Sequence, residues 1–589
     1  MAATLDAAPV PSHVSVRRRE RWTLGALVTF LVVALLGPAL GWGYVLTYDM
    51  VFVPRQSLLP ESVGLSDSLP RAVPQDAVVA LLTHIAPGAV WQHLALISAI
   101  ALSSLGAARM LRGSSLWVRC AAATLAVWNP WFVERLYIGH WALLLGYAVL
   151  PWALIAARQA RSGRTSIGPW ILWVALGSLV PTSGVLLVVV TLPVLLVRSV
   201  LPRARKTWAV LAACALQLPW LVPALTNPSG VSSDPTGVSV FGLRAEGPWG
   251  AWVSALGLGG IWNSEVAPAT RGTILALLGL VLIGALAIAG WSALVKRVGR
   301  SVAYTLTASG LGGLVIACVS TTSPGLATLE WASTHVGGIG LLRDSHKLLA
   351  PLALLVAMSA ALGAERLVAA LREPAVRGVV IAAVLVLPIV AMPDAIWGGT
   401  GRLDAVTYPD DWSTVRQLLA SETAPGDVVA LPWSTFRSFA WNARRTLLDP
   451  APRAMPRTTV VDDTLMVARN SEIVSVSGED PRAARIGRVV RSGAPLAPVL
   501  RESGVGWALL ERGTPSGPGT ANLTGLRPVF EGSELVLLRV DTPDVRPGAA
   551  RARVLAVGVA DFLATIVLLL GVFLTLRGAH RRRQKIRGT

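Results

Sequence analysis

The stretch RRRERWTLGALVTFLVVALLGPALGWGYVL, residues 17–46, decides the fold class of this chain. Four of its first five residues are arginine, and an apolar run follows at 22–46. A helix needs about 20 apolar residues to cross a hydrocarbon core of about 30 Å, so the run predicts a membrane span. It is longer than the apolar region of a signal peptide and has no clear small-residue cleavage site, which favours a retained first span.

Apolar runs of similar length recur along the chain. They predict twelve spans, at 22–46, 89–111, 115–131, 141–158, 168–181, 184–200, 207–225, 272–294, 301–320, 346–370, 377–393 and 554–576. The pair at 168–181 and 184–200 is short and joined by a tight turn. It is therefore either an out-and-back pair of spans or a partly re-entrant element.

Basic residues mark one side of these spans. They fill every second loop and the tail, in the segments 17–21, 109–119, 158–164, 198–206, 296–300, 366–377 and 577–587. Lysine and arginine near span ends resist translocation, so these segments are expected to be cytoplasmic. Both termini are then cytoplasmic, the chain is a multi-pass protein of a cell membrane, and the other loops are extracytoplasmic.

Composition supports this class and excludes others. The 589 residues are 53% hydrophobic and 14% charged, with a mean hydropathy of +0.59; a soluble protein is about 25% charged. The net charge of +19 is spread over thin loops, which indicates topology and contact with membrane lipids, so no nucleic-acid partner is expected. The three cysteines all lie in predicted spans and support no disulfide framework.

The composition changes after residue 393. Residues 394–550 contain no spanning run, and they predict helices at 411–421 and 498–502 interleaved with strands at 427–432, 505–510, 527–530 and 535–540. We therefore divide the chain into a transmembrane domain at 1–393 with eleven spans, a small extracytoplasmic α/β domain at 394–550, and a last span with a basic cytoplasmic tail at 551–589.

Charged residues are few in the outer loops, so each is a candidate for function. Asp49 follows the first span, where an apolar surrounding can raise the pKa of a carboxyl and make it a base near neutral pH. The segment 129–140 carries Glu134, Arg135 and His140 between two spans. The planar guanidinium of Arg135 suits a phosphate. Its aromatic neighbours indicate an interfacial belt, formed by Trp128, Trp131, Tyr137 and Trp141.

A second cationic group opens the tenth span. Arg343, His346 and Lys347 stand at the start of a long helix, where free N–H groups and the helix dipole favour an anion. We interpret Asp344, between them, as the cap of that helix. A lipid phosphate could therefore bind here, with Arg135 and His140 as further contacts.

Several short segments of the chain resemble a known class of enzymes. The segments 48–49, 129–140, 181–184, 342–347, 408–412 and 431–433, in this architecture, resemble the GT-C class of polyprenyl-phosphate-sugar-dependent glycosyltransferases, in the style of actinobacterial cell-envelope arabinosyl- and mannosyltransferases. The resemblance implies that Asp49 is the general base and that Glu134 assists it or binds a divalent metal, Mg²⁺ or Mn²⁺. The first outer loop has no DD, DE or DxD pair, which leaves the metal open.

The expected function follows from the resemblance and the loop chemistry. We expect an inverting membrane glycosyltransferase that moves a sugar from a polyprenyl-phosphate donor to a cell-envelope glycan or glycolipid on the outer side, as part of cell wall biogenesis. Two alternatives stay open: a transporter or flippase for a lipid-linked substrate, and an inactive glycosyltransferase-like scaffold. Internal repeats would favour a transporter, and none is visible between the two halves of the chain.

Overall fold

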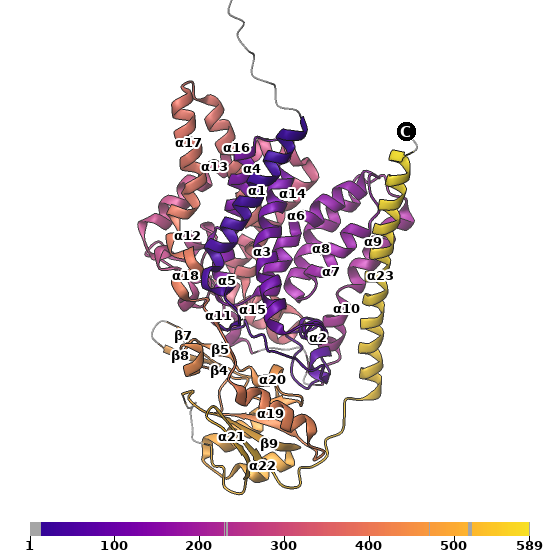
Figure 1. The fold of residues 1–589 in the computed structure, drawn as a ribbon, viewed down its shortest axis with the longest axis vertical. Coiled ribbons are helices and arrows are strands. Elements are labelled where there is room, and N and C mark those ends of the chain that lie inside the picture. The colour runs from indigo at the N-terminus through magenta and orange to yellow at the C-terminus, as the bar shows by residue number, and fades with distance from the viewer. Residues whose placement is uncertain (1–12, 229, 231–233, 470–471, 516–520, 588–589) are drawn as a thin grey trace, which may run out of the picture.

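The computed structural model describes residues 13–587 except 229, 231–233, 470–471 and 516–520, so the first twelve residues of the predicted transmembrane domain lie outside it. The described chain is mostly helical. Its helices form a bundle, and a smaller sheet-containing domain sits at one end of that bundle (Figure 1). The last helix runs back along the side of the bundle from the sheet domain. This arrangement is the polytopic membrane fold with an appended α/β domain that the sequence predicts.

Among the described residues, eight helices are long and apolar enough to cross a membrane. They are α1 (His13–Leu36), α3 (Gly88–Met110), α6 (Trp141–Arg161), α13 (Ile274–Val298), α14 (Arg300–Val319), α16 (Ala350–Ala370), α17 (Pro374–Ala391) and α23 (Arg551–Arg587). All eight were predicted from hydropathy. In α1 the spanning part continues through a 3₁₀ turn to Leu40.

The other four predicted spans are also helical, but they are broken or short. The helices α9 (Arg203–Ala215) and α10 (Leu218–Leu225) pass the same test together and meet at a bend of 55°. Three more apolar helices are shorter, namely α4 (Leu116–Val127), α7 (Gly168–Gly177) and α8 (Pro181–Leu196). The predicted helices are therefore present, while the count of twelve complete spans stays a prediction.

Close backbone contact between helices depends on glycine. A Cβ added at Gly290 of α13 would lie 1.9 Å from the carbonyl oxygen of Ser359, and one added at Gly363 of α16 would lie 1.9 Å from the carbonyl oxygen of Leu286. Small residues at such a crossing let two membrane helices approach until their backbones touch. The two glycines therefore let α13 and α16 pack with their backbones in contact.

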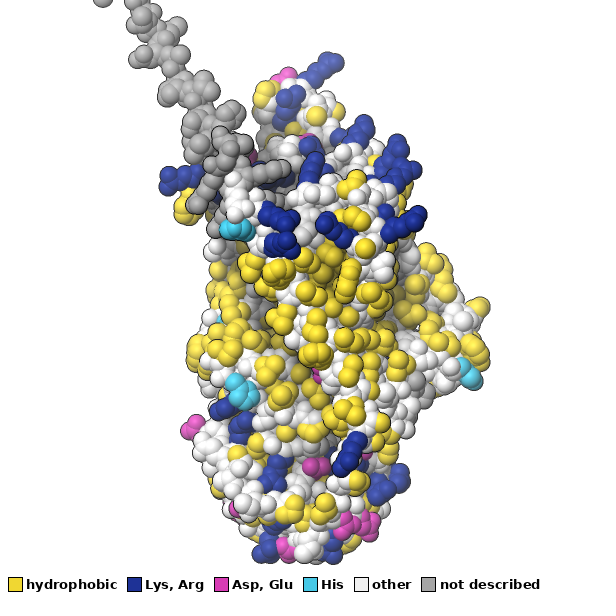
Figure 2. All heavy atoms as spheres, turned by 90° about the vertical axis from the view of Figure 1, so that its right-hand side faces the viewer, with side chains coloured by type: hydrophobic (Ala, Val, Ile, Leu, Met, Phe, Trp, Pro, Cys, Tyr) yellow, Lys and Arg dark blue, Asp and Glu magenta, His cyan; other side chains and the backbone are white. Residues whose placement is uncertain are grey.

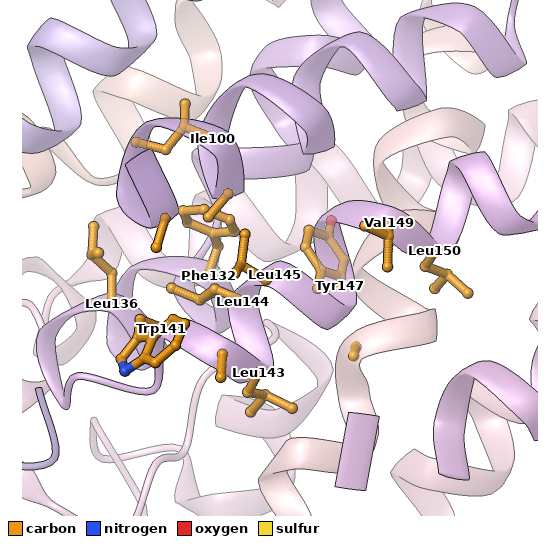
Figure 3. Packing of buried hydrophobic residues seen from close by; sticks show 14 of the residues in the cluster. Ile100, Phe132, Leu136, Trp141, Leu143, Leu144, Leu145, Tyr147, Val149 and Leu150 are labelled. Atoms are coloured by element: carbon orange, nitrogen blue, oxygen red, sulfur yellow. The ribbon is translucent and has the colours of Figure 1, made fainter. Parts of the chain in front are cut away.

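The aromatic residues around the second outer turn are not an interfacial belt, and that prediction is wrong. Trp128, Trp131, Tyr137 and Trp141 are all buried, the first two to within 2% of full burial. The ring of Trp131 lies 4.9 Å from that of Tyr147 in α6. Figure 3 shows Tyr147 and Trp141 within the same packed interior. These rings help to hold a short helix, α5 (Pro130–Tyr137), inside the bundle.

The outer segments contribute short helices and paired strands. Besides α5 the helices are α2 (Gln75–Thr83), where the sequence suggested one, and α11 (Thr236–Val240), α12 (Gly250–Leu256), α15 (Ser323–His335) and α18 (Ile396–Gly401), which contains a left-handed turn. Two-stranded pairs are formed by β1 (Tyr44–Val45) with β2 (Ala405–Val406), β4 (Phe436–Arg437) with β5 (Leu447–Leu448), and β7 (Leu465–Arg469) with β8 (Glu472–Val476).

A five-stranded sheet in the order β10-β11-β9-β3-β6 forms the centre of the small domain. Its strands are β3 (Asp427–Leu431), β6 (Thr459–Val460), β9 (Val505–Glu511), β10 (Arg527–Glu531) and β11 (Leu535–Arg539). The helices α19 (Asp410–Ser421), α20 (Ala451–Ala454), α21 (Pro481–Ser492) and α22 (Leu496–Glu502) belong to the same part of the chain. The predicted strands and both predicted helices are present, and β3 runs parallel to β9.

Charge is distributed unevenly over the surface. Figure 2 shows a band of lysine and arginine at the end of the bundle remote from the small domain, then a wide apolar belt, then mixed charges on the small domain. A belt of this kind is expected where lipid covers the protein, and a basic band is expected on the cytoplasmic side. The band on the face drawn in Figure 2 is of the kind that the alternation of basic loops in the sequence predicts.

Candidate functional site

Asp49 lies in a loop that is fixed from two sides. Its own N–H donates to the carbonyl of Ile138 at 3.1 Å, at the end of α5. On the other side, the N–H of Tyr48 donates to the carbonyl of Thr446 at 2.7 Å, and the N–H of Leu448 donates to the carbonyl of Tyr48 at 2.8 Å. The small domain and the bundle therefore hold the loop between them.

The carboxylate of Asp49 is half-buried and accepts a hydrogen bond from a histidine. Oδ2 lies 2.8 Å from Nε2 of His140, and 39% of the Asp49 side chain is exposed. Burial would raise the pKa of this carboxyl, but the hydrogen bond to His140 and the charges of Lys347 and Arg453 outweigh it and lower the pKa. The expected raised pKa is therefore wrong, because the sequence does not show these partners.

Arg135 belongs to α5, and the sequence fixes where this helix begins. The side chain of Asn129 accepts the N–H of Phe132, and Pro130 occupies the first turn, so α5 starts there. Arg135 is fully buried, and its Nη1 and Nη2 each donate to one oxygen of Asp344 at 2.7 Å. Such a bidentate pair is the strong form of an ion pair.

Asp344 does not cap the helix that begins the tenth predicted span, so that interpretation is wrong. Its side chain makes no hydrogen bond to the following 3₁₀ turn, Ser345–Leu349. The bond to Arg135 takes its place. Burial would raise the pKa of Asp344, but the charges of Arg135 and Lys347 hold it well below its usual range. The carboxylate is thus a permanent negative charge inside the bundle.

The remaining predicted residues divide into two groups. His346 Nδ1 lies 2.8 Å from Nη2 of Arg135, and Nζ of Lys347 lies 3.4 Å from Oδ2 of Asp344, with 26% of the lysine side chain exposed. Arg343 lies apart, with its guanidinium 4.9 Å from the ring centre of Phe241. Burial, with the charge of Arg71, lowers the pKa of Arg343 to about 10.

Glu134 faces a different set of partners from its neighbour in the chain. Its Oε2 accepts the N–H of Ile261 at 3.3 Å and lies 3.6 Å from Nε2 of His346. The side chain is fully buried. Burial raises the pKa of this carboxyl well above its usual value, and the charge of Glu246 adds to the effect. Glu246 in turn pairs with Arg271 at 2.9 Å.

The structure brings six of the seven predicted site residues into one cluster of short contacts. Asp49, His140, Arg135, His346, Glu134 and Lys347 are linked directly or through Asp344, whereas Arg343 is not. The sequence did not reveal that Asp344 pairs with Arg135, or that the carboxylate of Glu246, with its partner Arg271, lies next to Glu134. The scarcity of charged residues in the outer loops was the one sequence feature that could have pointed to Asp344, Glu246 and Arg271 as candidates.

A divalent metal does not fit the two acids that the sequence suggested for it. The described part of the chain contains no group of three or more His, Cys, Asp or Glu side chains placed to hold a metal ion. Asp49 is hydrogen-bonded to His140, and Glu134 is buried with a raised pKa, which disfavours the ionised form that Mg²⁺ or Mn²⁺ requires. We therefore derive no chemical step through a metal.

Comparison with known proteins supports the fold. No protein-family model and no curated sequence matches the chain. The structure is similar to the arabinofuranosyltransferase AftD from Mycobacteria, with a TM-score of 0.55 and 19% identity, covering 89% of this chain and 40% of that one. A mutant form of AftD matches with a TM-score of 0.53 and 18% identity, covering 91% and 42%. ArnT from Cupriavidus metallidurans matches with a TM-score of 0.43 and 12% identity, covering 90% and 100%.

The two matches to AftD define a class of fold. The chain has the fold of a GT-C-type membrane glycosyltransferase, as its resemblance to that class predicted. It spans about two fifths of the length of AftD. At 18% and 19% identity the match shows the fold alone, so the activity has to be argued from the site.

Proposed function

We propose that the chain transfers a sugar from a polyprenyl-phosphate donor to an envelope glycan or glycolipid at the extracytoplasmic face of the membrane. The observation that carries the proposal is the half-exposed carboxylate of Asp49, which the bundle and the small domain fix in place. It belongs to a cluster whose other acids are buried, so it is the group of the cluster best placed to meet an acceptor.

The proposed reaction is a single displacement. Asp49 takes the proton of the acceptor hydroxyl, and the hydroxyl oxygen forms a bond to the anomeric carbon of the sugar. The bond between that carbon and the phosphate oxygen breaks, and the polyprenyl phosphate leaves with the electron pair. Configuration at the anomeric carbon is inverted. The base needs to be ionised, and the lowered pKa of Asp49 keeps it so at neutral pH.

Lys347 is the cation that we assign to the leaving phosphate. It is partly exposed and stands beside Asp344, whose carboxylate balances its charge. An ammonium group placed where negative charge develops lowers the barrier of a group transfer. We assign no phosphate contact to Arg343, whose guanidinium lies over the ring of Phe241.

The test is sugar transfer in isolated membranes. We expect Asp49→Asn to lower the transfer rate from polyprenyl-phosphate sugars by about 10²–10⁴-fold, the usual contribution of a general base. The control is Asp410→Asn, which makes the same change on an exposed residue at the start of α19. Full transfer by Asp49→Asn would remove Asp49 as the base.

An inactive scaffold is the second candidate, and one observation favours it. The second acid that the resemblance implies, Glu134, is fully buried and held by the backbone of Ile261. A wild-type chain that transfers no sugar from a panel of polyprenyl-phosphate donors would support the scaffold. Uptake of a lipid-linked substrate into proteoliposomes without bond formation would support a transporter instead.

A further inference from the structure

The hydrogen bonds around Arg135 decide which nitrogen of two histidines carries the proton. An arginine has only N–H donors, and a neutral imidazole has one donor nitrogen and one acceptor nitrogen. Nη1 of Arg135 lies 3.1 Å from Nδ1 of His140, and Nη2 lies 2.8 Å from Nδ1 of His346. Both Nδ1 atoms are therefore acceptors, and both protons lie on Nε2.

The opposite sides of the two rings lead to the same assignment independently. Nε2 of His140 faces a carboxylate oxygen of Asp49 at 2.8 Å, and Nε2 of His346 faces the carbonyl oxygen of Leu258 at 3.2 Å. Neither oxygen can donate, so in each ring Nε2 must carry the hydrogen. Burial and the charge of Lys347 lower the pKa of His140, which agrees with a neutral ring.

Asp344 fixes the orientation of the Arg135 guanidinium, so that Nη1 and Nη2 each point one hydrogen at a histidine. Each of Nη1 and Nη2 has two hydrogens, and each nitrogen donates one hydrogen to Asp344 and one to a histidine. The four hydrogens are then all used. Nε of Arg135 is buried and has no partner among the described residues. The four Nη hydrogens are therefore taken by Asp344 and the two histidines, and the one remaining N–H, on Nε, is buried and not exposed to the phosphate of a donor.

We propose that Arg135 is a positioning residue that fixes His140 in its Nε2–H form, so that the imidazole donates to Asp49 and orients its carboxylate. The other oxygen of Asp49, Oδ1, is not the one that faces His140, and in the proposal it receives the acceptor's proton. This inference rests on the proposed function only for that last step. It reassigns Arg135 and the two histidines, which the sequence suggested as phosphate ligands.

The tautomer is tested without any activity. The chain is labelled with ¹⁵N-histidine and studied by solid-state NMR in proteoliposomes, and the His140→Phe variant identifies the signal of His140 among the seven histidines. We expect an unprotonated Nδ1 and a protonated Nε2 at neutral pH. A protonated Nδ1, or an imidazolium with both nitrogens protonated, would overturn the proposal. A chain that shows the expected tautomer but transfers no sugar would sink the proposed function and leave the assignment of protons intact.

The role of Arg135 is tested with a variant that keeps the interior neutral. Arg135→Met combined with Asp344→Leu removes both charges of the buried pair, which is tolerated far better than removing one. We expect the His140 signal to show exchange between tautomers. We also expect kcat to fall on the order of 10²-fold, because a misplaced base slows the chemical step. An unchanged His140 signal in this variant would contradict the positioning role. So would an unchanged kcat, because a residue that positions the base acts on the chemical step.

Discussion

Two buried arginines of this chain both pair with carboxylates, but only one of them is linked by hydrogen bonds to a partly exposed side chain. Arg437 in the small domain pairs with Asp449 at 2.5 Å and with Glu511, and all three side chains are at least 98% buried. Arg135 in the bundle pairs with Asp344 and also reaches two histidines, one of which leads to the half-exposed Asp49. The first cluster is closed by carboxylates, whereas the second opens onto the surface. Burial of charge therefore marks a structural site in one region and a candidate catalytic site in the other.

The largest effect should come from breaking the closed cluster. Arg437→Met leaves Asp449 and Glu511 buried without their counter-charge, and we expect the free energy of unfolding to fall by about 3–5 kcal/mol. Thermal unfolding of the full chain in detergent measures this as a lower Tm. The matched control is Arg527→Met, which breaks the exposed pair with Asp541 and should leave Tm unchanged. Equal Tm values for the two variants would show that the closed cluster does not stabilise the fold.

A smaller effect is expected at the open end of the second cluster. Lys347→Gln removes the partly exposed cation and should raise the KM for the donor about tenfold, equivalent to about 1.4 kcal/mol. Initial rates at varied donor concentration measure it. Because Asp344 keeps its bidentate pair with Arg135 in this variant, Tm should change little. An unchanged KM would mean that another group binds the phosphate.

The smallest effect should be a shift in pH dependence. Asp49 faces His140, Lys347 and Arg453, and the last of these also pairs with Asp76 at 3.2 Å. His140→Phe removes one hydrogen bond that lowers the pKa of Asp49, so that pKa should rise. In the proposed reaction, activity depends on the ionised carboxylate and is lost as pH falls through its pKa. The acid limb of kcat/KM should therefore move to higher pH, and a limb that stays in place would show that His140 does not tune the base.

The sequence predicted the helices and the small domain well because both follow from local patterns. Apolar runs fixed the spans, and turn residues and alternation fixed β3, β9, β10 and β11. The pairing of Arg135 with Asp344 could not be predicted, since the two residues are 209 positions apart and meet only through the packing of helices. The same is true of the pKa of Asp49, because the sequence indicates an apolar surrounding but does not show the hydrogen bond from His140 or the nearby cations, which lower that pKa.

The pairing of the Asp49 loop with residues 446–448 constrains the order in which the protein can be completed. The loop leaves the ribosome early, yet its partners in the small domain follow about 400 residues later, which at about 5–20 residues per second is roughly 20–80 s of synthesis. A nascent chain stopped in that interval can insert its first helices but lacks the strand that anchors the acid. The Asp49 loop would thus acquire its shape only after the helices up to α17 have been made, so a shorter chain would lack the geometry that the proposed transfer requires.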